Sequence, residues 1–127
     1  KIYEADLTFV DQLTTGIELI SEYYVIDNKD PATDKSHTTS FFYVQAGKTF
    51  ADFVTPYARY ESFEDLDTND PYFKTLGTTE YRRGLGGVRF DFTLIRGAAT
   101  SIKVEAGARK GPAGWNESYA VQWTFGY

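Results

Sequence analysis

The residue types that could form a nucleophilic site are concentrated between residues 34 and 40. His37, the only histidine of the chain, lies there with Asp34, Ser36 and Ser40. A serine nucleophile needs a base and an orienting acid that the fold brings within hydrogen-bond distance. Asp, Ser and His are also ordinary loop residues, and nothing else in the sequence fixes their geometry. We therefore predict that the protein is not an enzyme and has no catalytic residue.

A second polar stretch has the spacing of a calcium-binding loop only in part. Asp65, Asp67 and Asn69 match its first three ligand positions, but Asp70 and Leu76 stand where such a loop has Gly and Glu. A chain with one histidine and no cysteine is also poor in ligands for transition metals. We expect no metal site and no cofactor.

Most ionisable side chains instead alternate with apolar ones, which is the two-residue period of a β-strand. In the last segment, ESYAVQWTFGY, the apolar side of the strand is formed by Tyr119, Val121, Trp123, Phe125 and Tyr127. The same period along the rest of the chain collects polar residues on the opposite face of the predicted sheet. The predicted members of this polar face are Glu4, Asp6, Glu18, Glu22, Gln45, Tyr57, Arg59, Glu61, Arg89, Asp91, Lys103, Glu105, Arg109 and Gln122.

Seven segments carry the alternation, and none has a convincing helical period. They are residues 2–10, 15–27, 40–47, 53–62, 87–92, 100–110 and 117–127. The sequence therefore predicts one all-β domain over residues 1–127, built as an antiparallel up-and-down sheet of about seven or eight strands. The longest unbroken apolar runs are four residues, which excludes membrane-spanning helices. A net charge of -5 argues against nucleic acid as a partner.

The predicted connections alternate in length. Short links occur at Gln12–Thr15, Ala46–Thr49 and Leu94–Thr100, and longer polar links occur at Asn28–His37, Glu64–Thr79 and Gly111–Asn116. One end of the sheet should therefore carry tight turns and the other end loops. This asymmetry, with apolar residues outside and charges inside, is typical of outer-membrane barrels, which have short periplasmic turns and longer extracellular loops.

Several segments resemble a known family. ESYAVQWTFGY is similar to the terminal β-signal of bacterial outer-membrane proteins, although Tyr127 stands where Phe is most frequent. The segments VTPYARYE, GLGGVRFDF and SIKVEAGARK, in this order, resemble the closing strands of porin-like outer-membrane barrels. The resemblance covers most of residues 38–127. It implies a transmembrane β-barrel in the outer membrane of a Gram-negative bacterium, in contact with the lipid bilayer and lipopolysaccharide and inserted by the outer-membrane assembly machinery. The residues that it implies for the membrane interface and the assembly signal are Tyr119, Val121, Trp123, Phe125 and Tyr127.

The number of strands adds an expectation about the extent of the barrel. If Tyr127 is periplasmic, seven strands place Lys1 on the outside, whereas a complete bacterial barrel has an even number of strands. We therefore expect residues 1–127 to be the C-terminal part of a larger barrel. The alternative is an eighth strand around Tyr72–Thr78 that closes a small barrel.

The expected function is a porin-like channel for passive diffusion of small polar solutes or ions. Seven acidic and four basic side chains on the polar face predict a weak preference for cations. One alternative is a non-conducting structural barrel, or an anchor subunit of an envelope complex, whose interior charges pair across strands and fill it. Another is a soluble barrel that binds an apolar ligand among inward-facing rings. Homo-oligomerisation is left open.

Overall fold

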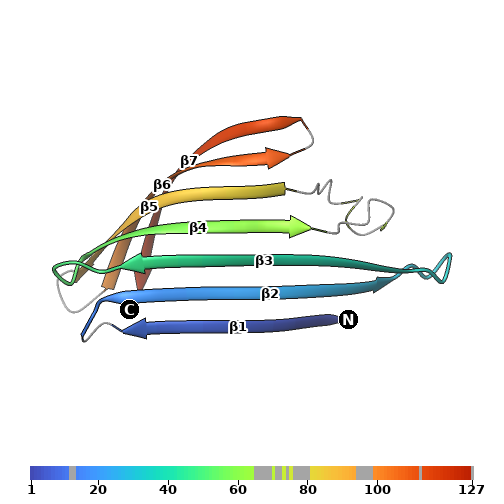
Figure 1. Ribbon diagram of the computed structural model, residues 1–127, viewed down its shortest axis with the longest axis horizontal. Helices are drawn as coiled ribbons and strands as arrows, with labels where there is room; N and C mark the ends of the chain where they lie inside the picture. Colours follow the sequence, from blue (N-terminus) through green and yellow to red (C-terminus); the bar gives the residue numbers. More distant parts are fainter. Residues whose placement is uncertain are drawn as a thin grey trace.

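The computed structural model describes residues 1–11, 14–64, 70, 73, 75, 81–93, 99–111 and 113–126, with only the backbone at positions 64, 81, 93 and 126. Seven strands follow one another along the chain: β1 (Ile2–Asp11), β2 (Ile17–Lys29), β3 (Ser36–Lys48), β4 (Val54–Glu64), β5 (Tyr81–Thr93), β6 (Ala99–Gly111) and β7 (Gly114–Gly126). They form one sheet in the order β1 to β7, with every neighbouring pair antiparallel (Figure 1). The predicted up-and-down antiparallel sheet is confirmed. The sheet is open, and β1 and β7 are its two edges.

The connection lengths differ from the prediction in two places. Five residues link β1 to β2, β3 to β4 and β5 to β6, while the links at the opposite end have six, sixteen and two residues. The predicted long link at Asn28–His37 is wrong, because Asn28 pairs with His37 and only six residues join β2 to β3. The predicted long loop at Gly111–Asn116 is also wrong, because Gly111 pairs with Gly114 across a two-residue turn. Gly114 has a φ of 108°, a conformation that glycine adopts without strain, so the glycine-rich stretch makes a tight hairpin.

The alternative of an eighth strand at Tyr72–Thr78 is not supported at the two positions that can be described. Phe73 and Thr75 have helical backbone conformation, and the rest of that segment lies outside the described residues. The predicted calcium-like positions Asp65, Asp67 and Asn69 also lie outside them. Among the residues that the structure describes, no helix is long and apolar enough to cross a membrane.

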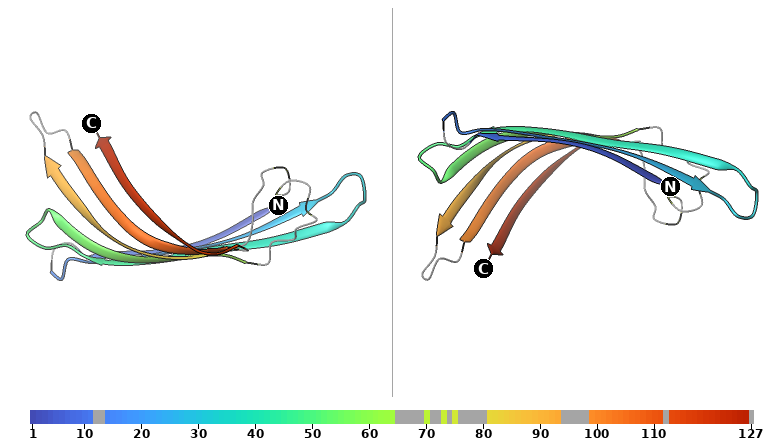
Figure 2. Two further views of the ribbon diagram at one scale, coloured as in Figure 1. Left: turned by 90° about the horizontal axis from the view of Figure 1, so that it is seen from above. Right: turned by 90° about the horizontal axis from the view of Figure 1, so that it is seen from below.

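The register of the sheet separates the side chains into two faces. Glu18 pairs with Gly47, which pairs with Tyr57, which pairs in turn with Gly87, so paired residues form rows that run across the strands. Figure 2 shows that the sheet is strongly curved. On one face, side chains from strands that are not neighbours bond to each other, as Arg89 of β5 does with Glu18 of β2. We call this the concave face, and the opposite one the convex face.

Burial is greater on the concave face than on the convex one. The most buried apolar residues, Tyr57, Phe73 and Leu85, lie with the concave face or against it, and Glu18, Thr39 and Thr55 are buried there as well. The convex face instead exposes large apolar side chains. They include Leu7, Phe9, Tyr23, Tyr60, Phe92, Val104, Tyr119, Val121, Trp123 and Phe125. The sheet is therefore inverted relative to a soluble sandwich, where the apolar face is the buried one.

A glycine on β5 explains how one buried ring fits. A Cβ atom built on Gly87 lies 2.8 Å from the Tyr57 ring and 2.9 Å from the carbonyl oxygen of Val104, whereas nothing is within 4 Å of one built on Gly84. We therefore expect Gly87→Ala to lower the free energy of unfolding by about 1–3 kcal/mol through overpacking. Gly84→Ala, the matched control on the same strand, should be neutral or slightly stabilising.

Thermal and denaturant unfolding of both variants under the same conditions checks this prediction. Equal stability of the two variants would show that the Tyr57 ring does not need the space above Gly87.

The turn between β2 and β3 has an acid-sensitive element. The Asp30 carboxylate accepts hydrogen bonds from the Thr33 hydroxyl at 2.6 Å and the Ala32 amide at 2.9 Å, which lower the pKa of Asp30 below its usual 3.8. Because the pKa is lowered on folding, these bonds are fully present above about pH 4 and are lost as the pH falls through the lowered value. The Ala32 amide resonance should titrate with a midpoint below 3.8 in NMR spectra, and this titration should be absent in Asp30→Asn. A midpoint at or above 3.8 would contradict the hydrogen-bonded turn.

Candidate functional site

The polar residues predicted from the sequence all share the concave face. The register places Glu4 opposite Tyr24, Asp6 opposite Glu22, and Arg89 opposite Lys103, and the same parity holds for the remaining members. These are Glu18, Gln45, Tyr57, Arg59, Glu61, Asp91, Glu105, Arg109 and Gln122. This face is the candidate functional site, since it gathers most of the ionisable groups within the strands.

One ion pair spans four strands of the site. Two guanidinium nitrogens of Arg89 on β5 lie 3.2 and 3.3 Å from the two carboxylate oxygens of Glu18 on β2. The Arg89 side chain reaches Glu18 across β4 and β3, because Thr55 is small and Gly47 has no side chain at the crossing points. Arg89 also pairs with Asp91 at 2.9 Å. This bidentate geometry gives a directed, charge-assisted contact that ties β2 to β5.

A second contact crosses β5 at Gly87. The Tyr57 hydroxyl on β4 donates to the Glu105 carboxylate on β6 at 2.5 Å. Glu105 also lies 3.5 Å from Arg59, which pairs with Glu61 at 2.8 Å. The Glu61 and Glu105 carboxylates thus each have a cationic or hydroxyl partner, as burial of charge requires.

The acidic side of the site lies on β1 and β2. Glu22 accepts hydrogen bonds from the hydroxyls of Tyr24 at 2.8 Å and Tyr43 at 2.7 Å. The same Tyr24 hydroxyl lies 3.1 Å from a Glu4 oxygen, so Glu4 and Glu22 share its single proton. Gln45 donates to Glu18 at 3.1 Å, and Glu18 also pairs with Arg89. Neutral hydroxyls bind Glu4 and Glu22 without neutralising them, so these two carboxylates keep the negative charge of this side of the concave face.

The sequence prediction omitted the two tyrosines that bind Glu22, Tyr24 and Tyr43, and one charged residue of the strands, Arg83. Arg83 on β5 lies 3.8 Å from a Glu61 oxygen and donates to the Ser118 hydroxyl at 3.3 Å. The predicted strand began at Gly87, because Leu85 on the polar side interrupts the alternation. Extending the two-residue period backwards from Arg89 past Leu85 places Arg83 on the concave face, and this was the available signal.

Residues of the connection between β4 and β5 contact the concave face near the end of the sheet that also carries the β2–β3 and β6–β7 connections. Asn28 donates to the fully buried Asp70 at 2.8 Å, and the ring of Phe73 meets that of Phe63 edge-on at 5.7 Å. Phe63 is in turn part of a row of rings with Phe41 and Tyr24. At these residues the connection is held against the inner face of the sheet.

The residues considered for a hydrolase site are not assembled. His37 is buried on the concave face, while Ser36 and Ser40 follow the other parity and belong to the convex face. Asp34 is in the turn and pairs with Lys29 at 2.6 Å. The described residues contain no group of three or more side chains that could hold a metal ion.

The residues predicted to contact the membrane all lie on the convex face of β7 where they can be described. Tyr119, Val121, Trp123 and Phe125 are exposed by 53–76%, and Tyr127 lies outside the described residues. The indole nitrogen of Trp123 donates to the Thr100 hydroxyl at 2.8 Å, and its ring lies 4.5 Å from that of Phe125. These rings form an exposed apolar surface at one end of β7.

Comparisons with protein-family models, with curated proteins and with solved structures found no match.

Breaking the pair between Arg89 and Glu18 should destabilise the sheet more than removing both charges. Arg89→Met leaves the buried Glu18 carboxylate without its cation, and we expect a loss of about 1–3 kcal/mol in the free energy of unfolding. The double variant Glu18→Gln with Arg89→Met should recover part of this loss. Denaturant unfolding of the two single variants and the double variant measures the coupling, and a coupling energy of zero would show that the pair does not tie β2 to β5.

Proposed function

We propose that this chain forms part of the wall of a transmembrane β-barrel in a bacterial outer membrane. We further propose that the barrel is a porin-like channel for small polar solutes or ions. The large apolar side chains exposed on the convex face form a band across the sheet, which we call the apolar band. The observation that carries the proposal is the course of this band. The band does not follow the register rows of the sheet but crosses them diagonally, as a membrane crosses tilted strands.

Charged residues on the convex face mark one border of the band, at the end of the sheet that carries the β2–β3, β4–β5 and β6–β7 connections. On β2 the border is Asp27, on β5 and β6 it is Arg82 and Lys110, and on β7 it is Glu117. Through the pairings between strands, Arg82 and Lys110 are in register with Tyr23 of β2, and Glu117 is in register with Ser21. Between β2 and β7 the border is thus displaced by six residues along the strands, with no step between β5 and β6.

This displacement corresponds to a definite strand tilt. Six residues at about 3.3 Å each, over five strand spacings of about 4.8 Å each, give an angle of about 40° between the border and the rows. Membrane barrels tilt their strands by about 35–45°. On β2 the band runs from Ile17 to Val25, which at this tilt is roughly 20 Å high, close to the apolar height of about 25 Å in such barrels.

The proposal also accounts for the exposure of the two faces. A band of exposed rings and aliphatic side chains on this scale marks a surface that contacts another apolar phase. In a lipid bilayer the convex face is solvated by acyl chains, and the ionisable concave face lines the lumen. The backbone groups at the edges β1 and β7 must then be paired, since an open edge is not tolerated in lipid.

Charge on the concave face supports a weak preference for cations. The carboxylates of β1 and β2 outnumber the cations near them, and those of Glu4 and Glu22 are bound by neutral tyrosine hydroxyls. The net field on that side of the lumen is negative, which favours the passage of cations.

A second candidate is a non-conducting barrel that serves as an anchor or as a subunit of an envelope complex. Two observations favour it: the ion pairs that cross the concave face, and the contacts of Asp70 and Phe73 with that face. A soluble barrel with an internal apolar ligand is less well supported, because the rings of Tyr119 and Trp123 are exposed on the convex side.

Single-channel recording in planar bilayers separates the channel from the anchor. For the channel, Lys103→Glu should shift the reversal potential in a salt gradient towards cation selectivity, because Lys103 lies on the concave face and has no ion pair among the described residues. Lys35→Glu, with the same charge change in the turn between β2 and β3, is the matched control and should have little effect. Insertion without conductance favours the anchor, and equal shifts for the two variants would contradict a lumen at the concave face.

A further inference from the structure

The free edge of β1 presents backbone groups that a further strand can pair with. β1 is the first strand of the sheet (Figure 1), and all but the last of its ten residues are exposed. The amide of Asp27 donates to the carbonyl oxygen of Lys1 at 2.8 Å. Because bonded pairs alternate along an antiparallel ladder, the odd-numbered residues of β1 bond to β2. The amide and carbonyl groups of the even-numbered residues, among them Glu4, Asp6 and Thr8, therefore point away from the sheet, as in a template for another strand.

The same even-numbered residues bring acidic charge to this edge on the concave face. Asp6 is directly opposite Glu22, and like charges at opposed positions destabilise a sheet. Asp6 has no hydrogen bond or ion pair among the residues that the structure describes, and Glu4 shares the Tyr24 hydroxyl proton with Glu22. A cationic side chain on the open side of β1 would relieve this repulsion.

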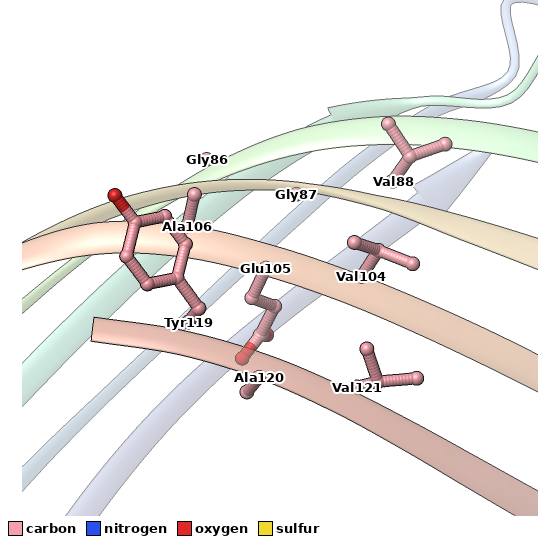
Figure 3. Close-up of a pocket in the computed structure, with 9 residues that line it drawn as sticks. All are labelled: Gly86, Gly87, Val88, Val104, Glu105, Ala106, Tyr119, Ala120 and Val121. Carbon is pink, nitrogen blue, oxygen red and sulfur yellow. The ribbon is translucent and has the colours of Figure 1, made fainter.

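The opposite edge of the sheet has no cation to offer. On the convex face, Tyr119 and Val121 of β7 line an apolar groove of about 450 Å³ together with Val88 and Val104 (Figure 3). The concave residues of β7 are all uncharged; they are Asn116, Ser118, Ala120, Gln122 and Thr124. Pairing with β7 would therefore leave the carboxylates of β1 without a counter-charge.

Strand direction also argues against a partner from among the seven strands. Every neighbouring pair is antiparallel, so β1 and β7 run in the same direction. In this chain, or between copies with the same orientation in a membrane, β7 would meet β1 in parallel. Antiparallel pairing of β1 with β1 of a second copy would bring two acidic strands together and would invert one copy in the membrane.

We propose that the β1 edge binds an antiparallel strand that is not one of β1–β7 and that carries Lys or Arg on its concave side, opposite Glu4 and Asp6. This inference rests on the proposed membrane function, which requires the edge to be paired. Charge complementarity selects the inner side chains of the partner strand. Its outer side chains are apolar, since they continue a surface on which Tyr3, Leu7 and Phe9 are exposed by 53–60%.

Binding of two synthetic peptides to the chain in detergent micelles tests this assignment. Each peptide has the ten-residue length of β1, alternates Val with Thr, and carries either Lys or Glu at two neighbouring polar positions. The lysine peptide should bind with a dissociation constant about tenfold lower, which is the effect expected when two opposed pairs change from like to opposite charge. Glu4→Gln with Asp6→Asn should abolish this difference. Fluorescence anisotropy of the labelled peptides measures both constants.

Two matched controls separate the edge and its charges from general effects. Thr8→Pro removes an amide donor from the open edge of β1 and should weaken binding of both peptides. Followed across the registers, the same alternation leaves the Val121 amide on the open edge of β7, so Val121→Pro should not weaken binding. Asp27→Asn with Glu117→Gln removes the same charge from the convex face and should leave the difference between the peptides intact.

The outcomes separate this inference from the membrane proposal. Equal binding of the two peptides, or binding of neither, would overturn the cationic partner strand. Self-association of the chain that Thr8→Pro abolishes would assign the edge to a second copy and overturn it as well. Absence of insertion into planar bilayers would instead contradict the membrane proposal, and peptide binding in micelles does not depend on insertion.

Discussion

A β-strand turns successive side chains to opposite faces, and here all seven strands keep that alternation in register with one another. A slip of one residue in any pair would move carboxylates and guanidinium groups onto the apolar face and rings onto the polar one. The register thus holds Glu18, Arg89 and Glu105 together on one surface. The charged concave face and the apolar convex face, which we propose to contact lipid, both depend on this constraint.

Stability in such a sheet does not come from an apolar core of the usual kind. The buried layer is largely polar, and its contacts join strands that are two or three places apart. Glycines at positions 47 and 87 make these crossings possible, because a side chain there would occupy the space of Glu18 or Tyr57. Curvature and the polar network therefore support each other: bending brings distant strands together, and the bonds between them hold the bend.

The strands and their faces were predictable because period-two alternation is a local signal that survives in a single sequence. The hairpin at Gly111 and Gly114 was missed, since glycine and proline mark a turn without giving its length. Arg83 was missed because Leu85 interrupts the polar side of β5. The partners of each charge could not be predicted at all. The contact between Arg89 and Glu18 depends on register and curvature, which arise only when the strands assemble.

The most direct test of a lipid-facing convex surface is a nitroxide scan of the protein in lipid vesicles. The chain has no cysteine, so single labels can be placed along β7 and β2. The account predicts that labels at Val121 and Trp123 are accessible to oxygen and that labels at Ala120 and Gln122 are accessible to a water-soluble nickel reagent. It also predicts that the deepest position is displaced by about six residues between β2 and β7 along the register. Equal accessibility of all these positions to the nickel reagent would contradict membrane contact of the convex face.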